Sequence, residues 1–204
     1  TQPLLLTSSG TKFGKTEEGA VWLDPQKTSP YKFYQFWMNT EDQAVEKLLK
    51  LFTFLSLEEI EEIMQVHRSA PERREAQRRL AWEVTGIVHG QDNAAMTKKA
   101  SGILFGESFE PRELSLSMLD TLAAEVPSGT VSRVFPALLT DILAEAGACS
   151  SKSEVRRLLK GGGLSVNGVK VTEEDASVSE DGILAGKYLF VRLGKKRFFM
   201  ILFQ

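Results

Sequence analysis

The sequence has almost none of the residues from which disulfides and metal clusters are built. Cys149 is the only cysteine among 204 residues, so no disulfide can form within the chain and no cysteine-based metal cluster is possible. His67 and His89 are the only histidines, and they match neither a metal triad nor a nucleophilic relay. We therefore expect a small buried thiol, histidines that interact as imidazolium with the ends of helices, and no metal site.

Long hydrophobic runs are also missing. No run approaches the ~20 apolar residues of a membrane-spanning helix, and no basic-then-apolar leader opens the chain. Apolar residues nevertheless make up 42% of the sequence, which is enough to build hydrophobic cores. The length exceeds a common domain of ~100–150 residues and predicts one large or two smaller units. We expect a soluble, cytoplasmic protein with no membrane segment.

The net charge of −2 conceals an asymmetry along the chain. Residues 28–127 contain 11 basic and 16 acidic side chains, a net charge of −5. Residues 134–204 contain 10 basic and 8 acidic side chains, a net charge of +2. The C-terminal third is therefore the better candidate for binding a polyanion.

Two lysines stand three residues apart near the start of the chain, in the run Lys12-Phe13-Gly14-Lys15-Thr16. Such a pair can place two ammonium groups around one polyphosphate and stabilise the charge that develops on a leaving pyrophosphate. The nucleotide loop G-x-x-x-x-G-K-[ST] is disfavoured, because one residue too few lies between Gly10 and Gly14. A solvated surface loop is the alternative to a phosphate site.

The middle of the sequence is helical by pattern. Ser29 is placed as an N-cap with Pro30 at the first helical position, and the aromatic run up to Trp37 predicts core packing rather than a stacking platform for bases. Possible capping boxes pair Thr40 with Gln43 and Ser56 with Glu59. A longer helix is predicted to begin at Pro71 and to end at Gly90. Three or four antiparallel helices would bury these apolar stripes.

A basic patch lies on the predicted longer helix, opposite its apolar stripe. Its members are Arg73, Arg74, Arg78 and Arg79. Such a patch can bind a phosphodiester backbone. However, glutamates at helical-neighbour spacing can neutralise it, and a solvated face is the favoured interpretation.

The run PSGTVSRV loses the helical period and predicts a linker over 128–134, after which a second pattern begins. A short helix is expected up to Gly147, and Ser151 with Glu154 predicts the cap of another that ends at Gly161. Two β-hairpins should follow. Asn167-Gly168 favours a type I′ turn in the first, and the second runs from Tyr188 to Phe203.

The clearest basic stripe of the sequence lies on the helix predicted after Ser151. Lys152, Arg156 and Lys160 follow at four-residue steps, Arg157 is adjacent, and only Glu154 stands nearby in sequence to offset them. The tip of the second hairpin carries three further cations, Lys195, Lys196 and Arg197. Both features strengthen the C-terminal third as the candidate for binding a polyanion.

The run KFGKT together with residues 17–37 resembles the bacterial and mitochondrial-type tyrosyl-tRNA synthetases. In that family KFGKT is the form of the class I signature KMSKS, whose mobile loop helps to bind ATP. The resemblance implies that Lys12 and Lys15 are catalytic and stabilise the triphosphate of ATP, bound with Mg²⁺. It implies an ATP-binding motif made of Lys12, Phe13, Gly14, Lys15 and Thr16.

The helix-turn-helix and hairpins of the C-terminal part resemble the RNA-binding domain named after ribosomal protein S-four, with which bacterial-type tyrosyl-tRNA synthetases end. This implies tRNA specific for tyrosine as the partner. The residues expected to contact RNA are Lys152, Arg156, Arg157, Lys160, Lys187, Lys195, Lys196 and Arg197.

The resemblance covers the chain but only the C-terminal half of such an enzyme. We expect an α+β fold with a remnant of the catalytic domain over 1–27, an α-helical anticodon-binding domain over 28–127, the linker, and an S-four-like domain over 135–204. The sequence lacks the H-x-G-H motif, so we expect a fragment that binds tRNA and is inactive alone. The resemblance implies that the intact enzyme joins tyrosine to tRNA and is a homodimer paired mainly through the half that is missing, so we expect the fragment to be a monomer. The alternative is a free-standing RNA-binding or regulatory module.

Overall fold

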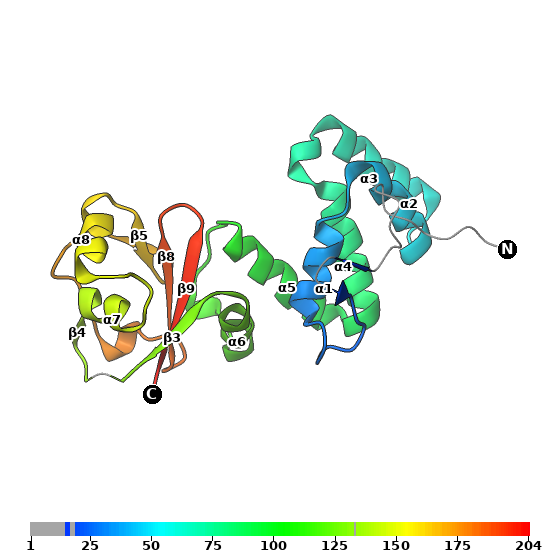
Figure 1. Cartoon of the computed structure of the whole chain (residues 1–204). Coiled ribbons are helices and arrows are strands. Elements are labelled where there is room, and N and C mark those ends of the chain that lie inside the picture. The colour runs from blue at the N-terminus through cyan, green and yellow to red at the C-terminus, as the bar shows by residue number, and fades with distance from the viewer. Residues whose placement is uncertain (1–14, 17–18, 133) are drawn as a thin grey trace. The chain divides into compact units, whose positions relative to one another are not determined.

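The computed structural model describes residues 15–16, 19–132 and 134–204 (Figure 1). Internal contacts divide the chain into two units, residues 1–101 and 102–204. The first unit is a helical bundle, and the second combines a small sheet with short helices. The predicted α+β class, a helical bundle followed by a small β-containing domain, is confirmed.

The first unit opens with a short hairpin and continues as helices. In chain order, its elements are β1 (Lys15–Thr16), β2 (Gly19–Ala20), α1 (Pro30–Met38), α2 (Asp42–Phe52), α3 (Leu57–Ser69), the 3₁₀ turn η1 (Pro71–Arg73), α4 (Glu75–His89) and the start of α5 (Gln91–Leu104).

Local capping signals set two of these helix starts as predicted. The Ser29 hydroxyl accepts a hydrogen bond from the Lys32 amide at the start of α1, where Pro30 is the first residue. At the start of α3, Ser56 Oγ accepts from the Glu59 amide at 3.1 Å while the Glu59 carboxylate accepts from the Ser56 amide at 2.8 Å. This second pair is a complete capping box, which satisfies two amides that a helix start leaves unpaired.

Two other predicted starts are wrong. The box of Thr40 and Gln43 does not form, because α2 is preceded by Glu41 without a side-chain cap and Thr40 is buried. Pro71 begins only the 3₁₀ turn, since Arg74 adopts a left-handed conformation with φ 54° and α4 begins after it. The predicted end at Gly90 is confirmed, with φ 87° at that glycine.

The aromatic run of α1 fills the core of the first unit, as predicted. Tyr31, Phe33, Tyr34 and Trp37 are all buried. Phe33 and Trp37 lie edge to face with ring centroids 6.1 Å apart, and they pack with apolar residues of α2, α3 and α4. These rings are therefore unavailable as a stacking platform for bases.

The second unit has the topology of a small sheet with helices. Its elements after α5 are η2 (Pro111–Glu113), α6 (Leu116–Glu125), β3 (Ser128–Val131), β4 (Ala137–Leu138), α7 (Leu139–Glu145), α8 (Lys152–Lys160), β5 (Leu164–Val166), β6 (Val169–Val171), β7 (Ser177–Val178), η3 (Glu180–Gly182), β8 (Tyr188–Leu193) and β9 (Arg197–Phe203).

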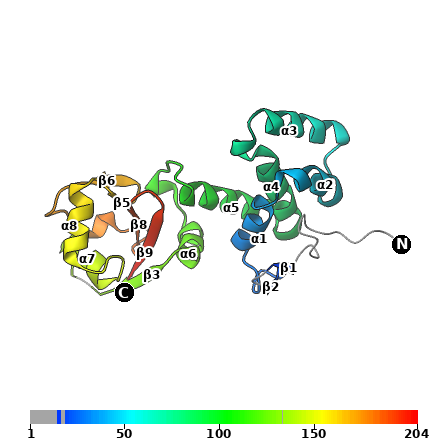
Figure 2. The same cartoon turned by 45° about the horizontal axis from the view of Figure 1, so that its top comes forward.

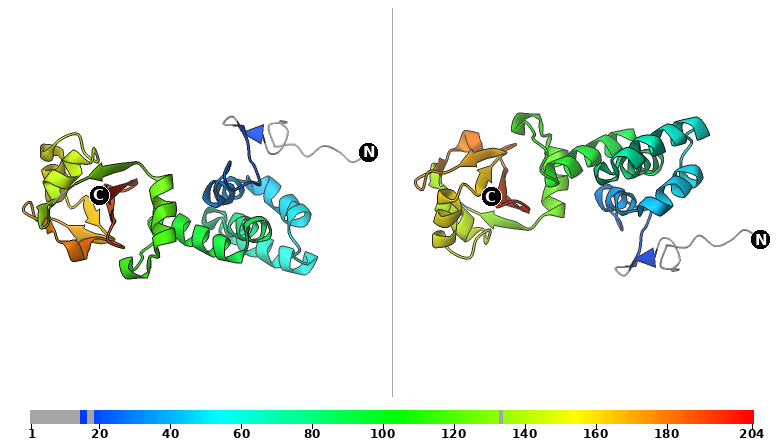
Figure 3. Two further views of the ribbon diagram at one scale, coloured as in Figure 1. Left: turned by 90° about the horizontal axis from the view of Figure 1, so that it is seen from below. Right: turned by 90° about the horizontal axis from the view of Figure 1, so that it is seen from above.

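Five of these strands form one sheet in the order β3-β9-β8-β5-β6. β3 runs parallel to β9, and the other neighbours are antiparallel. Alternate residues of β8 and β9, such as Leu189, Val191 and Ile201, form a core with α7 and α8. The views in Figures 2 and 3 show α7 and α8 on one side of the sheet and α6 on the other.

The segment predicted as a linker, 128–134, contains an ordered strand. Ser128–Val131 is β3, and it pairs with residues 200–203 of β9. A strand whose partner among the described residues lies about 70 positions later leaves little trace in its own sequence, so the Pro, Ser and Gly around it are typical of a loop. The other limits predicted for the domains stay a prediction.

Both predicted hairpins are present. Val166 pairs with Val169 across the two-residue turn, where Asn167 and Gly168 have φ values of 49° and 81°. Positive φ at both positions is the requirement of a type I′ turn, and Asn-Gly meets it at the lowest cost. In the part of the chain that the structure describes, no helix combines the length and apolar character needed to cross a membrane.

Candidate nucleic-acid interface

Helix α8 presents its basic residues outward because its apolar residues hold it to the core. Val155 and Leu159 are fully buried, whereas Lys152, Arg156 and Arg157 are exposed. The Ser151 hydroxyl caps the helix by accepting from the Glu154 amide at 3.2 Å. The four-residue spacing of the cations thus becomes a solvent-facing side of a firmly packed helix.

The one acidic residue of this helix, Glu154, lies in its first turn and forms its contacts there. Glu154 accepts hydrogen bonds from the Ser150 amide and hydroxyl, each at 2.8 Å, and these bonds lower the pKa of its carboxyl group. Its other oxygen lies 3.4 Å from Arg197 Nη2. Glu154 therefore binds the hairpin and the loop before α8, and among the described residues its ion-pair partner is Arg197 rather than a basic residue of α8.

Acidic residues from distant elements neutralise two of the lysines. Lys152 Nζ lies 2.9 Å from Asp141 Oδ1 on α7, and Lys160 Nζ lies 3.0 Å from Glu174 Oε1 after β6. The expectation that only Glu154 offsets the stripe is therefore wrong. The fold brings these carboxylates to α8 from other segments, which spacing along the helix cannot reveal.

Arg156 and Arg157 are the cations of α8 that stay available. Both are exposed, and within the described residues neither guanidinium has an ion-pair or hydrogen-bond partner. A guanidinium group can bind a phosphate with two parallel hydrogen bonds and always carries its charge. These two side chains are thus suited to an anionic backbone.

The tip of the β8–β9 hairpin supplies the second group of cations. Lys195 and Lys196 are exposed in the turn between Leu193 and Arg197, and no described residue pairs with their ammonium groups. Arg197 is instead engaged, since its Nη2 donates to the Ala148 carbonyl at 3.1 Å and lies near Glu154. That contact brings the tip to the beginning of α8.

Lys187, the last of the predicted contacts, interacts with the ring of the neighbouring Tyr188. Its ammonium lies over Tyr188, 4.9 Å from the ring centroid, and hydrogen bonding to Tyr188 raises the pKa of Lys187. The Tyr188 hydroxyl in turn donates to Asp120 on α6. The eight predicted cations therefore separate into an engaged set and an available set, the latter being Arg156, Arg157, Lys195 and Lys196.

The basic patch predicted on α4 is largely used inside the first unit. The Arg74 guanidinium donates to the carbonyls of Met38 and Thr40 at 2.6 and 3.0 Å. Arg79 pairs with Glu83 at 2.7 Å, and Arg78 Nε donates to the Arg73 carbonyl. The interpretation of this patch as a solvated or structural face is the one that the contacts favour.

The predicted ATP motif falls mostly outside the described residues. Lys12, Phe13 and Gly14 are not among them, and Lys15 and Thr16 are described only as β1, which pairs with β2 through Lys15–Ala20 and Thr16–Gly19. The catalytic role of the two lysines stays a prediction.

The histidines and the cysteine are buried or packed rather than poised for chemistry. His89 lies edge to face with Phe33, 4.8 Å between ring centroids, and burial lowers its pKa, which corrects the expected imidazolium cap. Cys149 is buried, as predicted, and burial raises the pKa of its thiol. Within the described residues, no group of His, Cys, Asp and Glu could hold a metal ion.

Arg192 and the cavity beside it were not predicted. The alternation of Tyr188-Leu-Phe-Val-Arg-Leu places Tyr188, Phe190 and Arg192 on the sheet face opposite the core. The sequence did offer one signal for this site, namely that Arg192 is a charged residue on an otherwise apolar face. The sequence did not reveal that residues 103–109 cover this face.

Comparisons with known proteins agree across both units. Residues 1–106 match the family described as tRNA synthetases class I (W and Y), and residues 118–201 match the tyrosine–tRNA ligase SYY-like C-terminal domain. The chain is 50% identical over 203 residues to the tyrosine–tRNA ligase of Anaeromyxobacter dehalogenans, which covers 98% of this chain and 48% of the relative. It is 43% identical to the Bacillus pumilus protein of the same name, over 100% and 48% of the two chains.

Among solved structures, a C-terminally truncated mitochondrial tyrosyl-tRNA synthetase from Aspergillus nidulans is 44% identical, with a TM-score of 0.42, over 42% of this chain and 25% of that one. The chain spans about half the length of the curated relatives it matches. On the family match, which includes more than half of its residues, the chain belongs to the class I tRNA synthetases of the tryptophan and tyrosine type.

Proposed function

We propose that this chain is the tRNA-binding C-terminal part of a tyrosine–tRNA ligase. The observation that carries the proposal is the pair of exposed guanidinium groups on α8 and the two lysines at the adjoining hairpin tip, none of which has a partner among the described residues. The name shared by the relatives supports tyrosine as the amino acid and its tRNA as the partner.

In this proposal, four cations contact the RNA backbone. Arg156 and Arg157 bind phosphates directly, while Lys195 and Lys196 add charge at the tip. Phosphate contacts supply affinity and position the RNA, but they do not read its sequence. The ion-paired residues Lys152, Lys160 and Arg197 instead hold α8 to its neighbours and contribute less to binding.

The chemistry belongs to the intact enzyme. There, ATP with Mg²⁺ and tyrosine form tyrosyl-adenylate, and the tyrosine is then transferred to tRNA. Lys12 and Lys15 stabilise the triphosphate as pyrophosphate leaves, by charge placed where negative charge develops. We propose that the intact enzyme is a cytoplasmic homodimer, and that the 204-residue chain is a monomer that binds tRNA without charging it.

The test compares two double variants of the same helix. Arg156→Ala/Arg157→Ala removes the two available cations of α8, and Lys152→Ala/Lys160→Ala removes the same charge from ion-paired positions. Binding to tRNA specific for tyrosine and to a non-cognate tRNA is measured by fluorescence anisotropy at several salt concentrations. We expect the arginine variant to bind both RNAs about ten- to one-hundred-fold more weakly, and the lysine variant less than about five-fold.

Equal losses in the two variants would contradict the assignment of the contacts to Arg156 and Arg157. Absence of tRNA binding by the unmodified chain would contradict the proposed function itself. Circular dichroism of each variant establishes that α8 is retained.

A further inference from the structure

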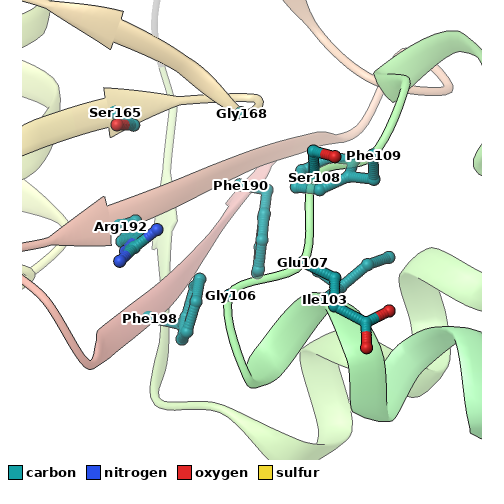
Figure 4. A pocket seen from close by; sticks show the side chains of 10 residues that line it. All are labelled: Ile103, Gly106, Glu107, Ser108, Phe109, Ser165, Gly168, Phe190, Arg192 and Phe198. Carbon is teal, nitrogen blue, oxygen red and sulfur yellow. The ribbon is translucent and has the colours of Figure 1, made fainter.

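A cavity of about 220 Å³ lies within the second unit, on the sheet face opposite α7 and α8. Figure 4 shows it between the sheet and the segment that follows α5, with Phe190, Arg192 and Phe198 on one side and Glu107 and Phe109 on the other. We propose that this cavity receives one unstacked base of the bound RNA. The inference rests on the proposed function, since it adds a base site to an RNA-binding surface.

The wall of the cavity is set by strand register. Ser165 on β5 pairs with Arg192 on β8, and Arg192 pairs with Phe198 on β9. Residues that pair directly across strands point to the same face of a sheet. The three side chains therefore form a row, and Phe190 extends it, because its ring stacks on Phe198 with centroids 5.4 Å apart and 10° between planes.

Arg192 is held in place but keeps an unused donor. Its guanidinium carbon lies 5.7 Å from the centroid of Phe198, and Nη2 donates to the Lys195 carbonyl at 2.9 Å. Its Nε is buried and has no hydrogen-bond partner among the described residues. A buried donor without a partner costs free energy, and an acceptor atom on a base edge would satisfy it.

The lining favours a base over a phosphate. Three phenylalanines, Phe109, Phe190 and Phe198, line the cavity, and Glu107 brings a carboxylate that would repel an anion. Aromatic rings and a guanidinium plane are the surfaces on which unstacked bases pack, and charged groups of both signs can bond base edges. The cavity is large enough for several water molecules but smaller than the ~300–1,000 Å³ of pockets that bind drug-sized molecules. This size suits a single planar group.

The site adjoins the cations of the hairpin tip. Arg192 stands three residues before Lys195 and donates a hydrogen bond to its carbonyl, so the base site and the available lysines, Lys195 and Lys196, share one short segment. A nucleotide whose base enters the cavity would carry its phosphate toward these lysines. The arrangement thus combines a contact that positions the backbone with one that can select a base.

The test fills the cavity without removing a charge. Ser165→Phe places a ring in the row beside Arg192, and Ser177→Phe makes the same change at an exposed position of β7 that does not line the cavity. Affinity for tRNA specific for tyrosine is measured against salt for both variants. We expect Ser165→Phe to weaken binding about ten-fold, equivalent to about 1.4 kcal/mol, with an unchanged salt slope, and Ser177→Phe to bind as the unmodified chain does.

A second measurement needs no variant. The ¹⁵N signal of Arg192 Nε and the ring signals of Phe198 are followed by NMR while the unmodified chain is saturated with this tRNA, or with each of the four nucleoside monophosphates. We expect both signals to shift with tRNA. If the unmodified chain binds tRNA and neither signal moves, or if Ser165→Phe and Ser177→Phe bind alike, the base site is refuted while the proposed function stands. Shifts with free nucleotides alone would overturn RNA as the source of the base.

Discussion

Helices α4 and α8 both carry arginines along one side, yet the fold uses them differently. On α4, Arg79 pairs with Glu83, and Arg74, just before the helix, binds two carbonyl oxygens of the same unit. On α8, Arg156 and Arg157 have no partner among the described residues. A basic stripe therefore indicates a binding surface only where the neighbouring elements leave its charges unpaired.

The largest effect on stability should follow from Arg74→Ala. The change removes the charged donor to the carbonyls of Met38 and Thr40; the Thr40 carbonyl keeps its bond from Gln77, whereas the Met38 carbonyl loses the donor from Arg74, and an unsatisfied buried carbonyl costs free energy. We expect the free energy of unfolding to fall by about 2–4 kcal/mol. All three tryptophans, Trp22, Trp37 and Trp82, lie in the first unit, so urea unfolding followed by tryptophan fluorescence reports on this unit.

Arg79→Ala is the matched control for that prediction. It removes an arginine whose exposed ion pair with Glu83 spans one helical turn, and such pairs contribute about 0.3–0.5 kcal/mol. If the two variants lose the same stability, Arg74 is not the structural residue that its contacts indicate.

A smaller effect on RNA binding should follow from a substitution that turns an engaged cation into an available one. Glu174→Gln removes the carboxylate that lies 3.0 Å from Lys160 Nζ, so this lysine can turn to the RNA. We expect about two-fold tighter binding to tRNA and a slightly steeper salt dependence. Glu173→Gln is the control, because it removes the same charge one residue away, where the carboxylate bonds Thr172 instead. Equal gains in both variants would mean that only net charge matters.

The smallest effect concerns His89. Burial lowers its pKa in the folded state, so the unfolded chain binds this proton more readily. The stabilisation is therefore complete above the unfolded pKa of about 6.5 and is lost as the pH falls below that value. We expect urea unfolding between pH 5 and 8 to show a loss of stability at acid pH that His89→Gln reduces. An unchanged pH dependence in the variant would show that His89 is not its source.

Local signals in the sequence predicted much of the fold. The capping box of Ser56 and Glu59 and the Asn167-Gly168 turn were predicted correctly, because the residues that form each lie within a few positions of one another. The box at Thr40 failed because Thr40 is buried, and its carbonyl accepts from Arg74 and Gln77 on a later segment. Strand β3 was missed for the same kind of reason, since its partner is β9.

In the candidate site, too, local features were predicted from the sequence and contacts between distant elements were not. The spacing of cations predicted that α8 would present a basic side, and the helix does so. Spacing could not predict the carboxylates of Asp141 and Glu174, which reach Lys152 and Lys160 from other elements. The distinction between available and engaged charges therefore had to come from the structure.

The most direct test compares the two helices by the salt dependence of tRNA binding. Arg156→Ala/Arg157→Ala on α8 and Arg78→Ala/Arg79→Ala on α4 each remove two arginines from a helix surface. Each phosphate contact contributes about 0.7–0.9 to the slope of log K against log salt. We predict that the α8 variant lowers the slope by about 1.4–1.8 and that the α4 variant leaves it unchanged. An unchanged slope for α8 with a reduced slope for α4 would contradict the account.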